Sequence, residues 1–202
     1  MNATTNTISA ASLLILASTS RYRAELLRRL GVPFEQEAPG SDETPYPGEA
    51  AAALARRLAR TKAQAVAARH PQRWVLGADQ VCACGDALLG KPGTRQAALG
   101  QLQRLSGNSA QFFTAVALTQ GASGALHQAC DLTVVRFRHL GAAEIERYVD
   151  AEPAFDCAGG FKSEGLGVAL CAAIESGDQT GLVGLPLIAV RKLLAQTGLE
   201  LP

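Results

Sequence analysis

The sequence lacks the features of a nucleic-acid-binding or membrane protein. Its 19 Lys and Arg residues nearly balance its 18 Asp and Glu residues, and aromatic residues make up only 5% of the chain. Proteins that bind nucleic-acid backbones are usually more basic. No apolar run is long enough to span a bilayer. We therefore expect no nucleic-acid partner and no membrane partner, and any anion site must be built from a few placed residues.

Cysteine is also scarce, with five residues in 202. The odd number and the one-residue gap between Cys82 and Cys84 fit neither a disulfide framework nor a zinc site. The apolar run near the start is short and no Lys or Arg precedes Arg21, which argues against a secretion signal. We expect a cytoplasmic chain with free thiols, in which residues 1–11 form a disordered polar tail and residues 12–202 form a single domain.

Several catalytic and nucleotide-binding motifs are missing. The sequence has no P-loop lysine motif, no glycine-rich dinucleotide fingerprint and no Gly-x-Ser-x-Gly elbow. Its histidines, His70, His127 and His139, have no metal-ligand spacing. The sequence therefore gives no support to a P-loop protein, a Rossmann dinucleotide-binding protein or a Ser-His-Asp hydrolase.

Apolar runs and helical spacings alternate along the chain. The runs at 13–17 and 74–78 indicate buried strands, the second of which is expected to end at Asp79. Apolar residues at helical spacing from Tyr22 to Leu30 predict a helix that Gly31 stops. Antiparallel hairpins in the middle favour an α/β fold with a mixed sheet. Further helices are predicted at 48–69, 94–105, 142–149 and 187–196, with Pro186 at the first position of the last, and further strands at 34–38, 81–89, 111–118, 125–138 and 168–175.

Polar residues follow two of the expected strands. The hydroxyl and arginine side chains of residues 18–23 stand at a strand-to-helix junction, where backbone N–H groups favour an anion. Asp79 comes directly after a buried run, and a carboxylate there can bind Mg²⁺ or orient a water. Taken alone, the first segment is better explained as an ordinary helix cap with solvated arginines, whereas Asp79 fits a turn equally well.

Three further loops contain charged residues. Lys91 stands between glycine and proline, and Lys162 lies in a glycine-rich loop, so both can neutralise a phosphate. Glu164 in the same loop can read the edge of a base, and Glu43 of the pair Asp42-Glu43 can complete a metal site with Asp79. In isolation, each of these charges is better explained as solvated surface.

The order of these motifs resembles that of the Maf-like family of nucleoside triphosphate pyrophosphatases. The resemblance implies an elongated, twisted mixed sheet with flanking helices and two lobes around a central cleft. It also implies hydrolysis of the bond between the α- and β-phosphates and a divalent cation, Mg²⁺ or alternatively Mn²⁺. The family is often dimeric, so a homodimer is one expectation. The resemblance runs from about Leu14 to Leu194, through the segments 14–20, 41–43, 77–81, 89–92, 105–107 and 183–186.

The family's functional residues fall on matching positions of this sequence. The resemblance places the catalytic acid on Asp79 and the phosphate-binding residues on Ser18, Arg23 and Lys91. It places a metal-side carboxylate on Glu43, so that Asp79 and Glu43 would share the cation.

Three positions that vary with specificity in the family are Tyr22, Gln80 and Glu164. They resemble the branch that converts 7-methyl-GTP to 7-methyl-GMP and pyrophosphate. A carboxylate such as Glu164 can accept both N–H donors of the guanine edge. A cationic base over the Tyr22 ring gains roughly 0.5–2 kcal/mol, although Tyr22 lies in step with Leu26 and also fits a core position. Two alternatives stay open: the same chemistry on another nucleotide such as UTP or dTTP, and a nucleotide-binding regulator of cell division with little turnover.

Overall fold

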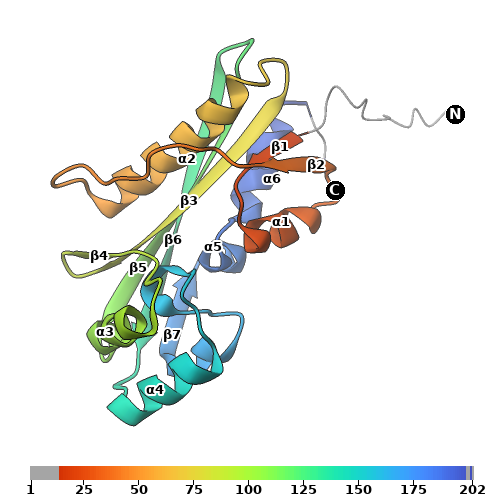
Figure 1. The fold of residues 1–202 in the computed structure, drawn as a ribbon. Coiled ribbons are helices and arrows are strands. Elements are labelled where there is room, and N and C mark those ends of the chain that lie inside the picture. Colours follow the sequence, from red (N-terminus) through yellow and green to blue (C-terminus); the bar gives the residue numbers. More distant parts are fainter. Residues whose placement is uncertain (1–13, 199–200, 202) are drawn as a thin grey trace, which may run out of the picture.

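One mixed sheet with flanking helices makes up the computed structural model, which describes residues 14–198 and 201 (Figure 1). The predicted polar tail, residues 1–11, lies outside the described residues. The described strands are β1 (Leu14–Ala17), β2 (Phe34–Glu37), β3 (Trp74–Cys84), β4 (Ala87–Leu89), β5 (Ser109–Gln120), β6 (Ala125–Phe137) and β7 (Cys171–Ser176). The described helices are α1 (Arg21–Arg28), α2 (Ala51–Ala67), α3 (Arg95–Leu105), α4 (Ala142–Ala151), α5 (Gln179–Val183) and α6 (Leu187–Ala195), with 3₁₀ turns η2 (Ala158–Gly160) and η3 (Leu166–Leu170).

The strand order is β2-β1-β3-β5-β6-β7, with β4 paired to β3. β1 runs parallel to both of its neighbours, whereas β3, β5, β6 and β7 pair antiparallel. The hairpins form where the sequence supplies turns, since Gly85 and Gly124 both adopt positive φ, a conformation that favours glycine. These pairings confirm the predicted mixed α/β fold.

The two faces of the sheet are covered differently. Helix α2 runs along one face and packs on Ile15, Val75 and Ala117 (Figure 1). This packing is close, because a Cβ at Gly77 would overlap the carbonyl oxygen of Ala59 in α2. A side chain at that position would push the helix away from β3.

The opposite face has two separate cores. Leu76 of β3 packs with α1 and α6, whereas Cys82, six residues further along the same strand, packs with α3 and α4. Side chains alternate along a strand, so these even-numbered residues share a face. Gln80 lies between the two cores on this face, and α5 lies against it. The two cores match the expected pair of lobes on one continuous sheet.

The second predicted strand ends later than expected. It was predicted to stop at Asp79, but β3 continues to Cys84, because β5 pairs with it without interruption through Asp79 and Ala115. The strand that does stop here is β1, whose last paired residue, Ala17, is level with Gly77. Asp79 therefore lies past the carboxyl end of β1 and within β3.

Near the carboxyl end, two other predictions were wrong in detail and one helix was not predicted. The strand predicted from Val168 begins at Cys171, because residues 166–170 form the turn η3. Pro186 caps α6 and is not its first helical residue. The five-residue helix α5 was not predicted; Asp178 caps it through the Thr180 N–H at 2.9 Å. Across the described part of the chain, no helix is long and apolar enough to cross a membrane.

Candidate active site

The turn between β1 and α1 is held by its own side chains. Ser18 is buried, and its Oγ accepts hydrogen bonds from the Ser20 N–H at 3.1 Å and from Arg23 Nη1 at 3.3 Å. Arg23 Nε donates to the carbonyl oxygen of Gly184 at 3.1 Å. The structure therefore brings together Ser18 and Arg23 as predicted, and ties both to the connection between α5 and α6.

Arg23 also faces negative charge. Burial lowers the pKa of its guanidinium, and the carboxylates of Asp79 and Glu43 act in the opposite direction. These two residues come from β3 and from the loop before α2. Residues distant in the sequence thus meet at the end of β1.

A lysine joins the two carboxylates. Lys62 Nζ lies 2.5 Å from Asp79 Oδ1 and 2.9 Å from Glu43 Oε1. The Asp79 and Lys62 side chains are 8% and 6% exposed, whereas that of Glu43 is 55% exposed. Burial of an ion is tolerated when it is paired, so Lys62 compensates the charge of Asp79.

Lys62 is the site residue that the sequence analysis missed. It lies four residues after Leu58 and eight after Leu54, on the buried stripe of α2. Apolar residues are expected at these spacings on a core-facing stripe. A charged residue among alanines and leucines was therefore the available signal, and it was overlooked because no motif contains it.

The loop before α2 is fastened in a way that positions Glu43. Arg57 of α2 pairs with both carboxylate oxygens of Glu49 at 2.7 Å and donates to the Thr44 carbonyl at 3.0 Å. The Arg57 guanidinium also lies 4.0 Å from the centroid of the Tyr46 ring. These contacts hold the loop against α2 at Thr44, which is next in sequence to Glu43.

Tyr22 contacts the second lobe and is not a core residue. Its ring is partly exposed. The Arg21 guanidinium lies 4.8 Å from the ring centroid, and Lys162 Nζ lies 5.4 Å from the same centroid. Arg21 Nη2 also donates to the Tyr22 hydroxyl at 2.8 Å. A hydrogen bond to Tyr22 is the largest cause of the raised pKa of Lys162. The helix start at 21–23 and the loop at 161–165 therefore meet through this ring.

Gln80 faces away from its neighbour Asp79, because successive residues of a strand alternate. Its Nε2 lies 3.0 Å from Thr114 Oγ1 and 3.0 Å from the carbonyl oxygens of Gly181 and Leu182. Both amide hydrogens are thus used to fix α5 against the sheet. The structure does not bring Gln80 into the cluster of Asp79, Lys62 and Glu43.

The comparison with known proteins identifies the family of the chain. Residues 13–197 match the sequence model of a family described as Maf-like protein. The chain belongs to the Maf-like family. Proteins named 7-methyl-GTP pyrophosphatase from Xanthomonas oryzae pv. oryzae and Pseudomonas aeruginosa are 57% and 50% identical to this Maf-like chain, over 94% of it and 98% of each relative. A protein of the same name from Thiobacillus denitrificans is 49% identical over 93% of both chains.

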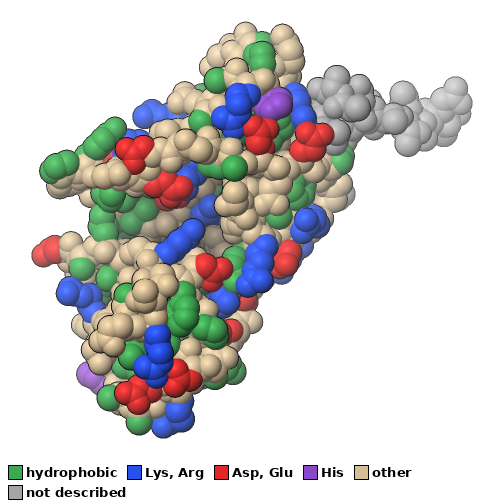
Figure 2. All heavy atoms as spheres, viewed as in Figure 1, with side chains coloured by type: hydrophobic (Ala, Val, Ile, Leu, Met, Phe, Trp, Pro, Cys, Tyr) green, Lys and Arg blue, Asp and Glu red, His purple; other side chains and the backbone are tan. Residues whose placement is uncertain are grey.

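The remaining predicted residues of the Maf-like chain lie on exposed loops. Lys91 and Glu164 are both exposed, and Ser163 Oγ donates to Glu164 Oε2 at 3.4 Å. The loop of Lys91 is anchored through the carbonyl oxygen of Gly90, which accepts from the Gly159 N–H at 3.3 Å. Figure 2 shows a hollow between the half that carries α2 and the half that carries α3 and α4, with Lys and Arg side chains in it.

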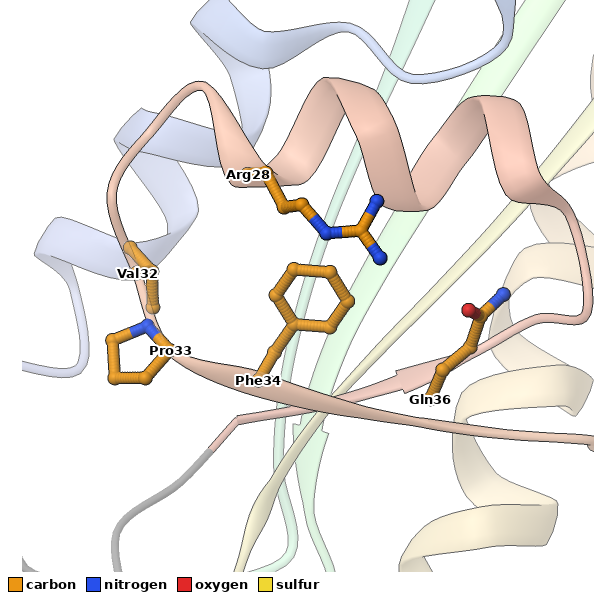
Figure 3. A pocket seen from close by; sticks show the side chains of 5 residues that line it. All are labelled: Arg28, Val32, Pro33, Phe34 and Gln36. Carbon is orange, nitrogen blue, oxygen red and sulfur yellow. The ribbon is translucent and has the colours of Figure 1, made fainter.

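A second hollow in the Maf-like chain, of about 340 Å³, lies between α1 and β2 (Figure 3). It is lined by Arg28, Val32, Pro33, Phe34 and Gln36, and the Arg28 guanidinium lies 5.8 Å from the Phe34 ring centroid. Gln36 Nε2 donates to the Ser20 carbonyl at 3.2 Å. The Gln36 side chain in the lining of this hollow thus contacts the N-cap residue of α1. None of the predicted site residues lines the hollow.

Proposed function

We propose that the chain is a nucleotide pyrophosphatase that hydrolyses 7-methyl-GTP to 7-methyl-GMP and pyrophosphate. The observation that carries the proposal is the buried pair of Asp79 and Lys62, extended by Glu43, beside the Arg23 guanidinium. The name 7-methyl-GTP pyrophosphatase, borne by relatives that are 49–57% identical, supports the choice of substrate.

Phosphate binding is assigned to the end of β1. Arg23 presents a guanidinium that is already oriented by Ser18 and Gly184, so little order is lost when a phosphate binds. Lys91 and Lys162, each on a loop, would add positive charge for the β- and γ-phosphates. Catalysis of phosphoryl transfer depends chiefly on such positioning and charge compensation.

Asp79 is assigned as the general base. It takes one proton from the attacking water, whose oxygen forms a bond to the α-phosphorus. The bond from the α-phosphorus to the bridging oxygen breaks, and its electron pair leaves with pyrophosphate. Lys62 holds the Asp79 carboxylate at 2.5 Å and thereby fixes its orientation toward the substrate.

A divalent cation fits this donor set. Within the described residues, no group of three or more His, Cys, Asp or Glu side chains could hold a metal by itself. Mg²⁺ is commonly bound by one or two carboxylates together with substrate phosphates and water. Asp79 and Glu43 would supply the carboxylates, and the bound ion would supply positive charge at the phosphates. We therefore expect Mg²⁺, or Mn²⁺ in its place, to bind mainly in the presence of nucleotide.

Base recognition is assigned to Tyr22 and Glu164. A methylated guanine would stack on the Tyr22 ring, in the place over which Lys162 Nζ now lies, and release Lys162 toward the phosphates. Glu164, exposed on its loop, would accept the two N–H groups of the guanine edge. Gln80 would contribute its carbonyl oxygen to base recognition, since its amide nitrogen is engaged with α5.

The test is release of pyrophosphate with Mg²⁺ from 7-methyl-GTP, GTP, UTP, dTTP, CTP and ITP. We expect a strong preference for 7-methyl-GTP, near-complete loss of turnover in Asp79→Asn, and weaker guanine selectivity in Glu164→Gln. Asp86→Asn, an exposed carboxylate on the β3–β4 turn, is the matched control and should keep wild-type rates. Wild-type turnover in Asp79→Asn would refute the mechanism, and preference for another base would refute the substrate. Binding without turnover would favour a regulator.

A further inference from the structure

The loop that carries Lys162 and Glu164 is held from behind by helix α4. Tyr148 of α4 is buried, and its hydroxyl oxygen accepts a hydrogen bond from the Lys162 backbone N–H at 3.1 Å. We call residues 162–167 the recognition loop. Its first peptide N–H is therefore tied to a buried side chain that is none of the groups assigned above.

The residue that caps the carboxyl end of α4, Glu152, holds the other end of the recognition loop. Glu152 Oε2 accepts a hydrogen bond from the Gly167 N–H at 3.3 Å. Burial is the main reason that the pKa of Tyr148 is raised, and the nearby Glu152 carboxylate raises it further. The side chains of Tyr148 and Glu152 thus each hold one end of the recognition loop, at Lys162 and at Gly167.

The glycines of the recognition loop make room for this support. A Cβ at Gly165 would overlap Glu152 Oε1, and a Cβ at Gly167 would overlap the Lys162 carbonyl oxygen. The φ of Gly165 is −120°, so no left-handed conformation requires glycine there. A side chain at 165 would therefore require the Glu152 carboxylate to move from its place against the loop.

We propose that Tyr148 and Glu152 are positioning residues that set the backbone of the recognition loop, and through it the base selectivity of the enzyme. The proposal rests on the proposed function, in which Glu164 reads the base and Lys162 meets the phosphates. Among the described residues, the exposed Glu164 side chain takes part in one hydrogen bond, with its neighbour Ser163. Its position is therefore governed chiefly by the backbone that Tyr148 and Glu152 hold.

The first experiment removes one acceptor. Tyr148→Phe deletes the hydroxyl and removes the acceptor of the Lys162 N–H, so the loop should shift to find a partner. Because an unpaired donor destabilises the present position of the loop, we expect KM for 7-methyl-GTP to rise about tenfold while kcat changes little. The preference for 7-methyl-GTP over GTP should fall in parallel. Glu146→Gln, an exposed change on the same helix, is the control and should leave both values unchanged.

The second experiment tests the contact between Glu152 and Gly165 directly. Glu152→Ala and Gly165→Ala should each raise KM, whereas Glu152→Gln keeps an acceptor for the Gly167 N–H and should restore most of the affinity. In the double variant, the new methyl group at 165 enters the space that Glu152 has left. Its KM should therefore be no higher than that of Glu152→Ala alone.

The outcomes separate this proposal from the proposed function. If the wild-type protein prefers 7-methyl-GTP but Tyr148→Phe and Glu152→Ala keep its KM and base ranking, the positioning role is refuted and the activity stands. Equal additive losses in the double variant would refute the contact as the cause. If the wild-type protein turns over no nucleotide, the proposed function fails, and this inference fails with it.

Discussion

Replacing Lys62 by methionine would test whether the buried cluster is held together by charge. Lys62 Nζ is 2.5 Å from Asp79 Oδ1, and both side chains are more than 90% buried. Methionine fills a similar volume but leaves the carboxylate without its partner. Removing one member of a buried ion pair lowers the free energy of unfolding by about 3–5 kcal/mol. The second partner of Lys62, Glu43, is half exposed, so losing that ion pair adds little to the destabilisation.

The measurement is the free energy of unfolding, from urea titration, and the melting temperature. For a chain of this length, the expected loss corresponds to a fall in Tm of roughly 10 °C. Asp79→Asn on the Lys62→Met background removes the unpaired charge and should recover part of the loss, giving a coupling energy of at least about 1 kcal/mol. Lys192→Met, an exposed change on α6, is the control.

Two results would contradict this reasoning. A Lys62→Met protein as stable as the Lys192→Met control would mean that the carboxylate is solvated or paired elsewhere. Strictly additive losses in the double variant would mean that Lys62 and Asp79 do not interact energetically. In either case, Lys62 would no longer be expected to orient Asp79.

Three other changes have defined outcomes. Gly77→Ala should lower the free energy of unfolding by about 3 kcal/mol and lower activity, because its Cβ would overlap the Ala59 carbonyl and push α2 from β3; chemical denaturation and turnover would show both. Arg57→Ala should raise the Mg²⁺ concentration needed for half-maximal turnover with little loss of stability, because it frees the loop of Glu43; a metal titration measures this. Tyr22→Phe should keep the substrate preference and Tyr22→Leu should lose it, since the ring and not the hydroxyl meets the base.

Much of the fold was predictable because its signals are local. The buried run of β1, the glycine stop at Gly31 and the hairpin turn at Gly85 each act through neighbouring residues. The length of β3 was not predictable in this way, because pairing with β5 decides whether Asp79 belongs to the strand. Helix α5 was missed because five residues carry too little periodicity to indicate a helix.

The site was predicted as a set of residues but not as an arrangement. Motif order pointed to Asp79 and Glu43, but no spacing in the sequence could show that a single ammonium lies between them. The order likewise pointed to Tyr22 and Lys162 without indicating that one would lie over the ring of the other. Such contacts depend on how α2 and the carboxyl-terminal loops pack on the sheet, which no local pattern records.

The residues assigned to catalysis and the residue assigned to base recognition lie on different kinds of structure. Asp79, Lys62 and Ser18 are buried on a strand, a helix and a turn fixed by the sheet, so the groups assigned to chemistry have little freedom to move. Glu164 is exposed on a loop whose position depends on a few hydrogen bonds to α4. A change in that loop can alter the base that is accepted without disturbing the buried cluster, since no core side chain has to repack. Selectivity among bases should therefore be easier to change by mutation than the position at which the triphosphate is cut.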